Sequence, residues 1–108
     1  MSDGEWTRIV ALSECQTGRG RYVTVGPHEL AVFRLESPSD QIIVTKNSCP
    51  HAGGNLAAGA LAGSIVTCPW HQWPFDLLTG ACPLSERVTL TRFESRVDDG
   101  WVWVRLPA

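Results

Sequence analysis

The sequence predicts an all-β protein whose base is an antiparallel β-sandwich or barrel. Short runs rich in Val, Ile, Leu, Tyr and Phe alternate with turn residues, and no stretch shows a convincing helical period. Trp101-Val102-Trp103-Val104 alternates aromatic and β-branched residues, as a strand buried on at least one face does. Asp98-Asp99-Gly100, directly before it, is a hairpin signal. Closely spaced turns between short strands are typical of sandwiches and barrels.

In the first half of the chain we expect strands at residues 8–12, 21–25, 29–35 and 41–45. Turn residues separate them at Gly18-Arg19-Gly20, Gly26-Pro27 and Ser37-Pro38-Ser39-Asp40. The C-terminal hairpin is expected to join residues 93–97 to residues 101–106. Trp101 and Trp103 of that hairpin are expected in the core.

The middle of the chain, residues 47–83, holds many of the glycines and prolines. We expect short strands at residues 64–67 and 74–77. At most one helical turn is expected at residues 57–61, because the glycines disfavour a longer helix. We interpret this stretch as a small lobe inserted into a β base that both ends of the chain complete. The length of 108 residues suits one domain, residues 1–108.

Two short segments of this lobe each pair a thiol with an imidazole: Cys49-Pro50-His51 and Cys68-Pro69-Trp70-His71. The candidate ligands are Cys49, His51, Cys68 and His71. Two sulfur and two nitrogen ligands are the donor set of a [2Fe–2S] centre in which two histidines replace two cysteines. The proline after each cysteine fixes φ and stiffens the loop. Gly53 and Gly54 permit a close approach of the backbone to a cluster.

Zinc and disulfide bonds are the alternatives for these residues. Structural zinc sites usually space their ligands as C-x₂₋₄-C and H-x₃₋₅-H, and the C-x-H spacing of the first segment departs from this. The four cysteines also permit two disulfides, although cysteines clustered with histidines in a reducing compartment indicate a metal more often. A further alternative is four buried core residues without any metal. The spacing and the flanking residues favour the cluster.

Composition excludes several classes of protein. The net charge is −2 and the arginines are scattered, so no basic stripe for a nucleic acid exists. No apolar run approaches the ~20 residues that span a membrane. The acidic start, Met1-Ser2-Asp3-Gly4-Glu5, lacks the pattern of a signal peptide. We therefore expect a cytoplasmic protein that binds neither a nucleic acid nor a membrane.

The two Cys–His segments and their surroundings resemble those of Rieske proteins. The first box is Cys49-Pro50-His51-Ala52-Gly53-Gly54-Asn55-Leu56, and the second is Cys68-Pro69-Trp70-His71-Gln72-Trp73-Pro74-Phe75-Asp76-Leu77 followed by Thr79-Gly80. With the C-terminal hairpin, the similarity covers most of the chain. It implies a β base with a rubredoxin-like cluster-binding lobe and one Rieske-type [2Fe–2S] cluster. Cys49 and Cys68 would bind the inner iron, and His51 and His71 the outer, solvent-facing iron.

Differences from respiratory and photosynthetic Rieske proteins narrow the subfamily. Those proteins have an extra cysteine in each box, and the two form a disulfide; this chain has Gly54 and Trp70 there. They also have a serine and a tyrosine that donate hydrogen bonds to sulfur, where this chain has Trp73 and Phe75. The missing hydroxyls predict a reduction potential around −150 mV or somewhat below, the lower end of the Rieske range. The chain is instead similar to soluble Rieske ferredoxins and to the small subunit of NADH-dependent nitrite reductases.

This resemblance implies one-electron transfer, with no catalytic residue and no enzyme activity of the chain's own. The first hypothesis is a soluble ferredoxin whose partners are a flavin reductase and a terminal oxygenase. The second is a small Rieske subunit of a nitrite-reductase-like complex, held by the large subunit. The third is a zinc-stabilised interaction module with no redox role.

The remaining cysteines and two tryptophans of the second box have simpler expected roles. Cys15 and Cys82 match no ligand position, so we expect them to be small buried hydrophobic residues. Trp70 is expected to shield the cluster from water. For Trp73, shielding and an exposed apolar docking rim stay open.

Overall fold

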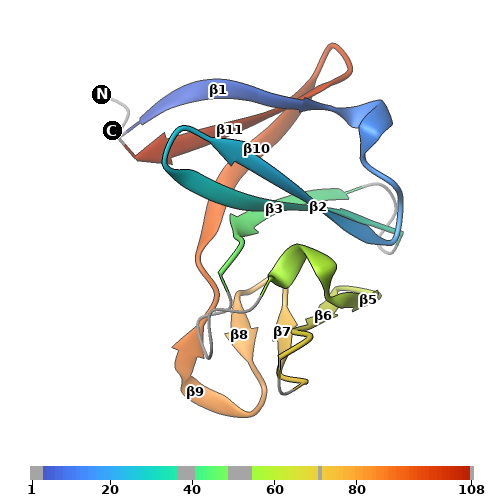
Figure 1. Ribbon diagram of the computed structural model, residues 1–108, viewed down its shortest axis with the longest axis vertical. Coiled ribbons are helices and arrows are strands. Elements are labelled where there is room, and N and C mark those ends of the chain that lie inside the picture. The colour runs from blue at the N-terminus through green and yellow to red at the C-terminus, as the bar shows by residue number, and fades with distance from the viewer. Residues whose placement is uncertain (1–3, 37–40, 49–54, 71, 108) are drawn as a thin grey trace.

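A six-stranded antiparallel sheet is the largest part of the computed structural model, which describes residues 4–36, 41–48, 55–70 and 72–107. The strand order is β1-β11-β10-β4-β3-β2, and the sheet forms the upper part of Figure 1. Its strands are β1 (Gly4–Ala11), β2 (Arg19–Val25), β3 (His28–Leu35), β4 (Gln41–Lys46), β10 (Arg92–Asp98) and β11 (Trp101–Pro107). Since β1 pairs with β11, both ends of the described chain contribute to this sheet. The prediction of an all-β fold is confirmed.

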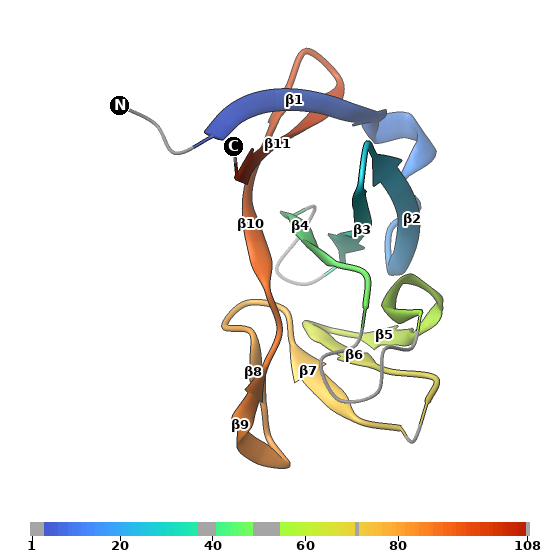
Figure 2. The same cartoon turned by 60° about the vertical axis from the view of Figure 1, so that its left-hand side comes forward.

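Shorter strands lie below this sheet in both views (Figures 1 and 2). A three-stranded sheet contains β5 (Ala60–Ala62), β6 (Ile65–Thr67) and β7 (Pro74–Asp76), and a two-stranded sheet contains β8 (Ala81–Cys82) and β9 (Ser85–Thr89). The helical segments of the described chain are two 3₁₀ turns, η1 (Leu12–Glu14) and η2 (Leu56–Ala58). None of the described helices is long and apolar enough to cross a membrane. The sequence did not predict β5, β8 and β9. β5 and β8 contain no β-branched or aromatic residue, and β9 begins with three polar residues, Ser, Glu and Arg.

Strand β3 is buried on both faces and separates two apolar cores. Leu30 and Val32 face a core that the curled six-stranded sheet encloses (Figure 2). Ala31, Phe33 and Leu35 face the opposite way, into a core shared with η2 and the short strands. A continuous apolar run is the pattern that burial on both faces requires. The lobe with the second Cys–His segment is therefore packed on the base through β3.

Glycines at two predicted turns have different roles. In the C-terminal hairpin, Asp99 has φ 53° and Gly100 has φ 78°, as a type I′ turn requires, so the predicted hairpin is confirmed. The predicted turn Gly18-Arg19-Gly20 is partly wrong, because β2 already begins at Arg19. A Cβ at Gly20 would lie 2.7 Å from the carbonyl oxygen of Ala57. Gly20 therefore lets η2 pack closely on β2. The predicted turn at residues 37–40 lies outside the described residues.

The expectation that Trp101 and Trp103 lie in the core is wrong. The strand alternates as predicted, but Val102 and Val104 are the residues that point into the core. The two tryptophans are half-buried on the other face of β11. There the guanidinium carbon of Arg8 lies 4.4 Å from the centroid of the Trp101 ring, a cation–π contact that covers part of the indole without removing it from the surface.

We expect Trp103→Phe to change the free energy of unfolding by less than about 1 kcal/mol. Within the described part of the chain, the Trp103 Nε1–H is buried without a hydrogen-bond partner, so removing this N–H removes a cost. Val104→Ala is the control, because it empties part of the core on the opposite face and should cost about 2 kcal/mol. Urea denaturation measures both. A cost for Trp103→Phe that equals that of Val104→Ala would contradict this account.

Candidate metal centre

Cys68 is the one predicted ligand that lies within the described residues. Cys49, His51 and His71 lie outside them, as do Gly53 and Gly54. The assembly of the four ligands into one site therefore stays a prediction. What the structure describes is Cys68 and the residues that flank the two segments.

The second segment begins at Cys68, directly after β6. Its backbone N–H donates a hydrogen bond to the carbonyl oxygen of Trp73 at 2.8 Å, and the preceding residue, Thr67, pairs with Pro74 of β7. β6 and β7 thus form a β-hairpin, and the second segment lies in the connection between them. Gln72 has φ 59°, the left-handed conformation that ends many such connections. The hairpin fixes the backbone on both sides of position 71.

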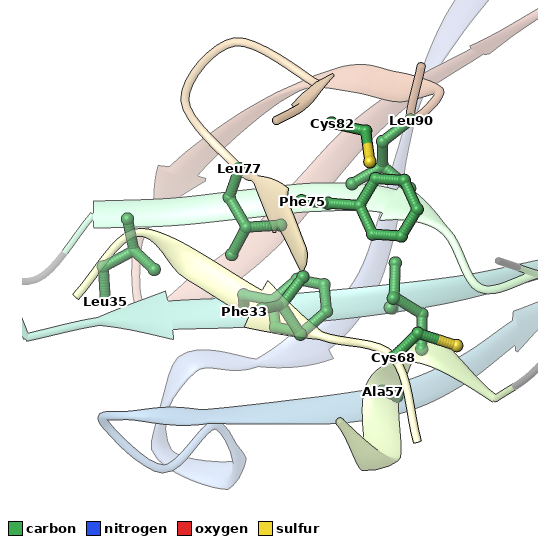
Figure 3. Packing of buried hydrophobic residues seen from close by; sticks show 11 residues of the cluster. Phe33, Leu35, Ala57, Cys68, Phe75, Leu77, Cys82 and Leu90 are labelled. Atoms are coloured by element: carbon green, nitrogen blue, oxygen red, sulfur yellow. The ribbon is translucent and has the colours of Figure 1, made fainter. Parts of the chain in front are cut away.

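The Cys68 side chain is 0% exposed and belongs to the core that packs against β3. Figure 3 shows its sulfur pointing away from Phe33 and Phe75, whereas the sulfur of Cys82 points toward Phe75. A thiol that is buried yet directed out of the apolar core can bind a metal, while the core excludes water from one side of the sulfur. Its surroundings fit a sulfur ligand of an iron–sulfur cluster.

The residues that flank the first segment are also joined by backbone contacts. Ser48 and Asn55 form an isolated antiparallel bridge, and the backbone N–H of Leu56 donates to the carbonyl oxygen of Asn47 at 2.9 Å. Asn47 is buried. Sequence reasoning did not single out Asn47, because a lone asparagine after a strand has no distinctive pattern.

The two tryptophans of the second box differ in exposure. Trp70 is 55% exposed. Its shielding of the cluster from water stays a prediction, because Cys49, His51 and His71 lie outside the described residues. Trp70 lies in a turn between β6 and β7. Trp73 is half-buried and packs against the core that contains Cys68. Of the two, Trp70 therefore presents the apolar surface that a docking rim needs.

Cys15 and Cys82 are buried, as predicted. Burial raises the pKa of the Cys15 thiol, and the positive charges of Arg21 and Arg34 offset only part of this rise. Cys82 packs in the same core as Cys68. Cys15, Cys68 and Cys82 are not in disulfides, so the disulfide alternative is wrong for these three.

A family model described as the Rieske [2Fe-2S] domain matches residues 5–94. The chain belongs to the Rieske [2Fe–2S] family. It carries one Rieske-type [2Fe–2S] cluster, so the prediction of the cofactor is confirmed and the zinc alternative is wrong. The β base and the short-stranded lobe described above are accordingly those of a Rieske fold.

Relatives of known type support the same assignment. Ferredoxin CarAc of Metapseudomonas resinovorans is 37% identical over 102 residues, which cover 92% of each chain. A chain of the complex of reduced oxygenase and oxidized ferredoxin in carbazole 1,9a-dioxygenase matches with a TM-score of 0.79 and 36% identity, covering 93% of this chain and 92% of that one. A putative NADH-dependent nitrite reductase small subunit from Mycobacterium tuberculosis matches with a TM-score of 0.85 and 25% identity, over 97% of both chains.

Proposed function

We propose that this Rieske protein is a ferredoxin that carries single electrons from a flavin reductase to a terminal oxygenase. The observation that supports this most directly is the similarity to ferredoxin CarAc, which extends over 92% of both chains. The carbazole dioxygenase structure, in which such a ferredoxin is complexed with an oxygenase, supports the same class of partner. The protein is an electron-transfer protein and needs no catalytic residue.

The proposed ligands are Cys49, His51, Cys68 and His71. Cys49 and Cys68 would hold one iron through thiolates, and His51 and His71 the other through imidazoles. The bound cluster supplies the capacity to accept and release one electron. The protein would contribute the ligands. For the second segment, the hydrogen bond from the Cys68 N–H to the Trp73 carbonyl oxygen joins the residues on either side of Trp70 and His71 and supports a fixed position of these ligands. A preorganised site of this kind changes little when its charge changes, which favours rapid transfer.

The surface around Trp70 is the proposed contact with the redox partners. Trp70 is an exposed aromatic residue next to the proposed ligand His71, and Pro69 and Gln72 beside it are exposed as well. Aromatic side chains are enriched in protein interfaces. Docking there would bring a partner close to the proposed histidine ligands of the site.

We include a cytoplasmic location in the proposal, because Cys15 and Cys82 are not in disulfides, which is in keeping with a reducing compartment. Residues 1–108 would form one domain, with the cluster-binding lobe at approximately residues 47–83.

The proposed function is tested by spectroscopy, potentiometry and electron transfer. We expect the dithionite-reduced protein to show the EPR spectrum of a Rieske centre and a reduction potential around −150 mV or somewhat below. The physical reason is that Trp73 and Phe75 provide no hydroxyl to stabilise the added charge. The reduced protein should then reoxidise on mixing with a Rieske-type oxygenase. A potential near the upper end of the Rieske range would contradict the proposed role of Trp73 and Phe75.

A small subunit of a nitrite-reductase-like complex is the second candidate. The TM-score of 0.85 to the nitrite reductase small subunit favours it, but the higher identity is to the ferredoxin. Purification from the native cell separates the two. A carrier is expected to dissociate from its partners, and copurification of a large reductase subunit in fixed ratio would favour the second candidate.

A further inference from the structure

The asparagine that follows β4 joins three segments of the chain. The backbone N–H of Asn47 donates to the carbonyl oxygen of Glu29 in β3 at 2.9 Å, and its carbonyl oxygen accepts from the N–H of Leu56 at 2.9 Å. Its side-chain oxygen Oδ1 accepts from the N–H of Ala57 at 2.8 Å, and its Nδ2 donates to Oδ1 of Asn55 at 3.0 Å. Both backbone groups and both ends of the amide are therefore hydrogen-bonded.

These bonds join residues that stand before and after the first Cys–His segment and its glycines in the sequence. Asn47 stands just before Ser48, and Ser48 pairs with Asn55 in an isolated bridge. Asn47 thus connects the chain before the segment to Asn55, which follows it, and to η2 directly after Asn55. Through Glu29 it also ties the segment to β3, the strand shared by both cores.

An asparagine is well suited to this position. Among the described residues, Thr45 and Asn47 are the buried ones with polar side chains. The Thr45 hydroxyl donates only to the neighbouring carbonyl oxygen of Lys46, a local contact. The Asn47 amide instead supplies an acceptor and a donor on two separate atoms to two different residues. Ala57 is itself buried, so its N–H would lose its partner without Asn47.

We infer that Asn47 is a positioning residue for the first pair of cluster ligands, Cys49 and His51. The inference rests on the proposed function, because it takes those two residues as ligands. Asn47 does not bind the cluster. It fixes the backbone on both sides of the stretch that carries Cys49 and His51. Through this it controls the rate at which the cluster is lost and the symmetry of the ligand field at the iron.

The test compares cluster retention with global stability. We expect Asn47→Ala to lose its visible absorption about tenfold faster than the wild type under an excess of iron chelator, because the Ala57 N–H and Asn55 lose their partner. Its reduced EPR spectrum should have altered g values. Asn47→Asp keeps an oxygen for the Ala57 N–H and should restore most of the retention. Urea denaturation of each variant gives its global stability.

Val102→Ala is the matched destabilised control, because Val102 is buried in the other core. It should lower the unfolding midpoint at least as much as Asn47→Ala while keeping the wild-type rate of cluster loss and g values. Equal cluster loss in the two variants, or wild-type behaviour of Asn47→Ala, would overturn the inference.

If Asn47→Ala does not fold, Asn55→Ala serves in its place. Asn55 is exposed, and this change removes only its side-chain hydrogen bond with Asn47. We expect a smaller acceleration of cluster loss, and an unchanged rate would count against the inference. A wild-type protein without a Rieske spectrum would instead refute the proposed function.

Discussion

Replacing Cys68 by alanine is expected to abolish cluster binding. The Cys68 thiol is the proposed second sulfur ligand and is 0% exposed, so alanine leaves the proposed site with one sulfur ligand instead of two. The purified Cys68→Ala protein should lack visible absorption and a Rieske EPR signal after anaerobic reconstitution with iron and sulfide. Circular dichroism should still report β structure, because most of the apolar surface is buried without the cluster.

Cys82→Ala is the control for this experiment. Cys82 lies in the same buried cluster as Cys68, so the two substitutions remove similar apolar volumes from one core. The two side chains differ in the direction of their sulfur atoms: the sulfur of Cys82 points toward Phe75, and that of Cys68 points away from it (Figure 3). Cys82→Ala should keep a full complement of iron. If it lost the cluster as Cys68→Ala does, Cys68 would be a packing residue and the proposed ligand set would be wrong.

Replacing Phe75 by alanine is expected to lower the free energy of unfolding by about 3–5 kcal/mol. Phe75 on β7 is 0% exposed and packs in the core that joins the lobe to β3 (Figure 3). Alanine would leave a cavity in the core between the lobe and the base. Urea or thermal denaturation of the reconstituted protein measures the loss.

Leu84→Ala provides the comparison for Phe75→Ala. Leu84 lies in the turn between β8 and β9 and is 62% exposed, so its removal should change stability by no more than about 0.5 kcal/mol. The contrast between the two variants tests whether the lobe is stabilised by the core it shares with β3. A loss below about 1 kcal/mol for Phe75→Ala would mean that the lobe contributes little to global stability.

Local sequence patterns predicted the strands of the base and the hairpin before β11. Their signals arise from neighbouring residues: alternation along a strand, and a turn in which Asp99 and Gly100 both take positive φ. The same local logic failed at Gly20. Its lack of a side chain serves the approach of Ala57, a residue distant in sequence, and no nearby residue indicates this.

The candidate site was predicted in the same uneven way. The two Cys–His segments were recognisable because the ligands of each lie within four consecutive residues. Asn47 was not recognisable, because its role depends on Asn55 and Ala57, which lie eight and ten residues further along the chain. The exposure of Trp70 could not be predicted, because an aromatic residue beside a ligand has no intrinsic preference between covering the site and facing solvent.

The sequence by itself therefore determined the fold class through short-range periodicity and the donor set of the cofactor through ligand chemistry. The family followed from the resemblance of the two Cys–His boxes to those of Rieske proteins. The tertiary structure decided which face of each strand is buried. Val102 and Val104 face the core while Trp101 lies under Arg8, because curling of the sheet determines which of two alternating faces becomes the inside. It also decided how the first Cys–His segment is anchored, because hydrogen bonds between distant residues form only when the strands have assembled.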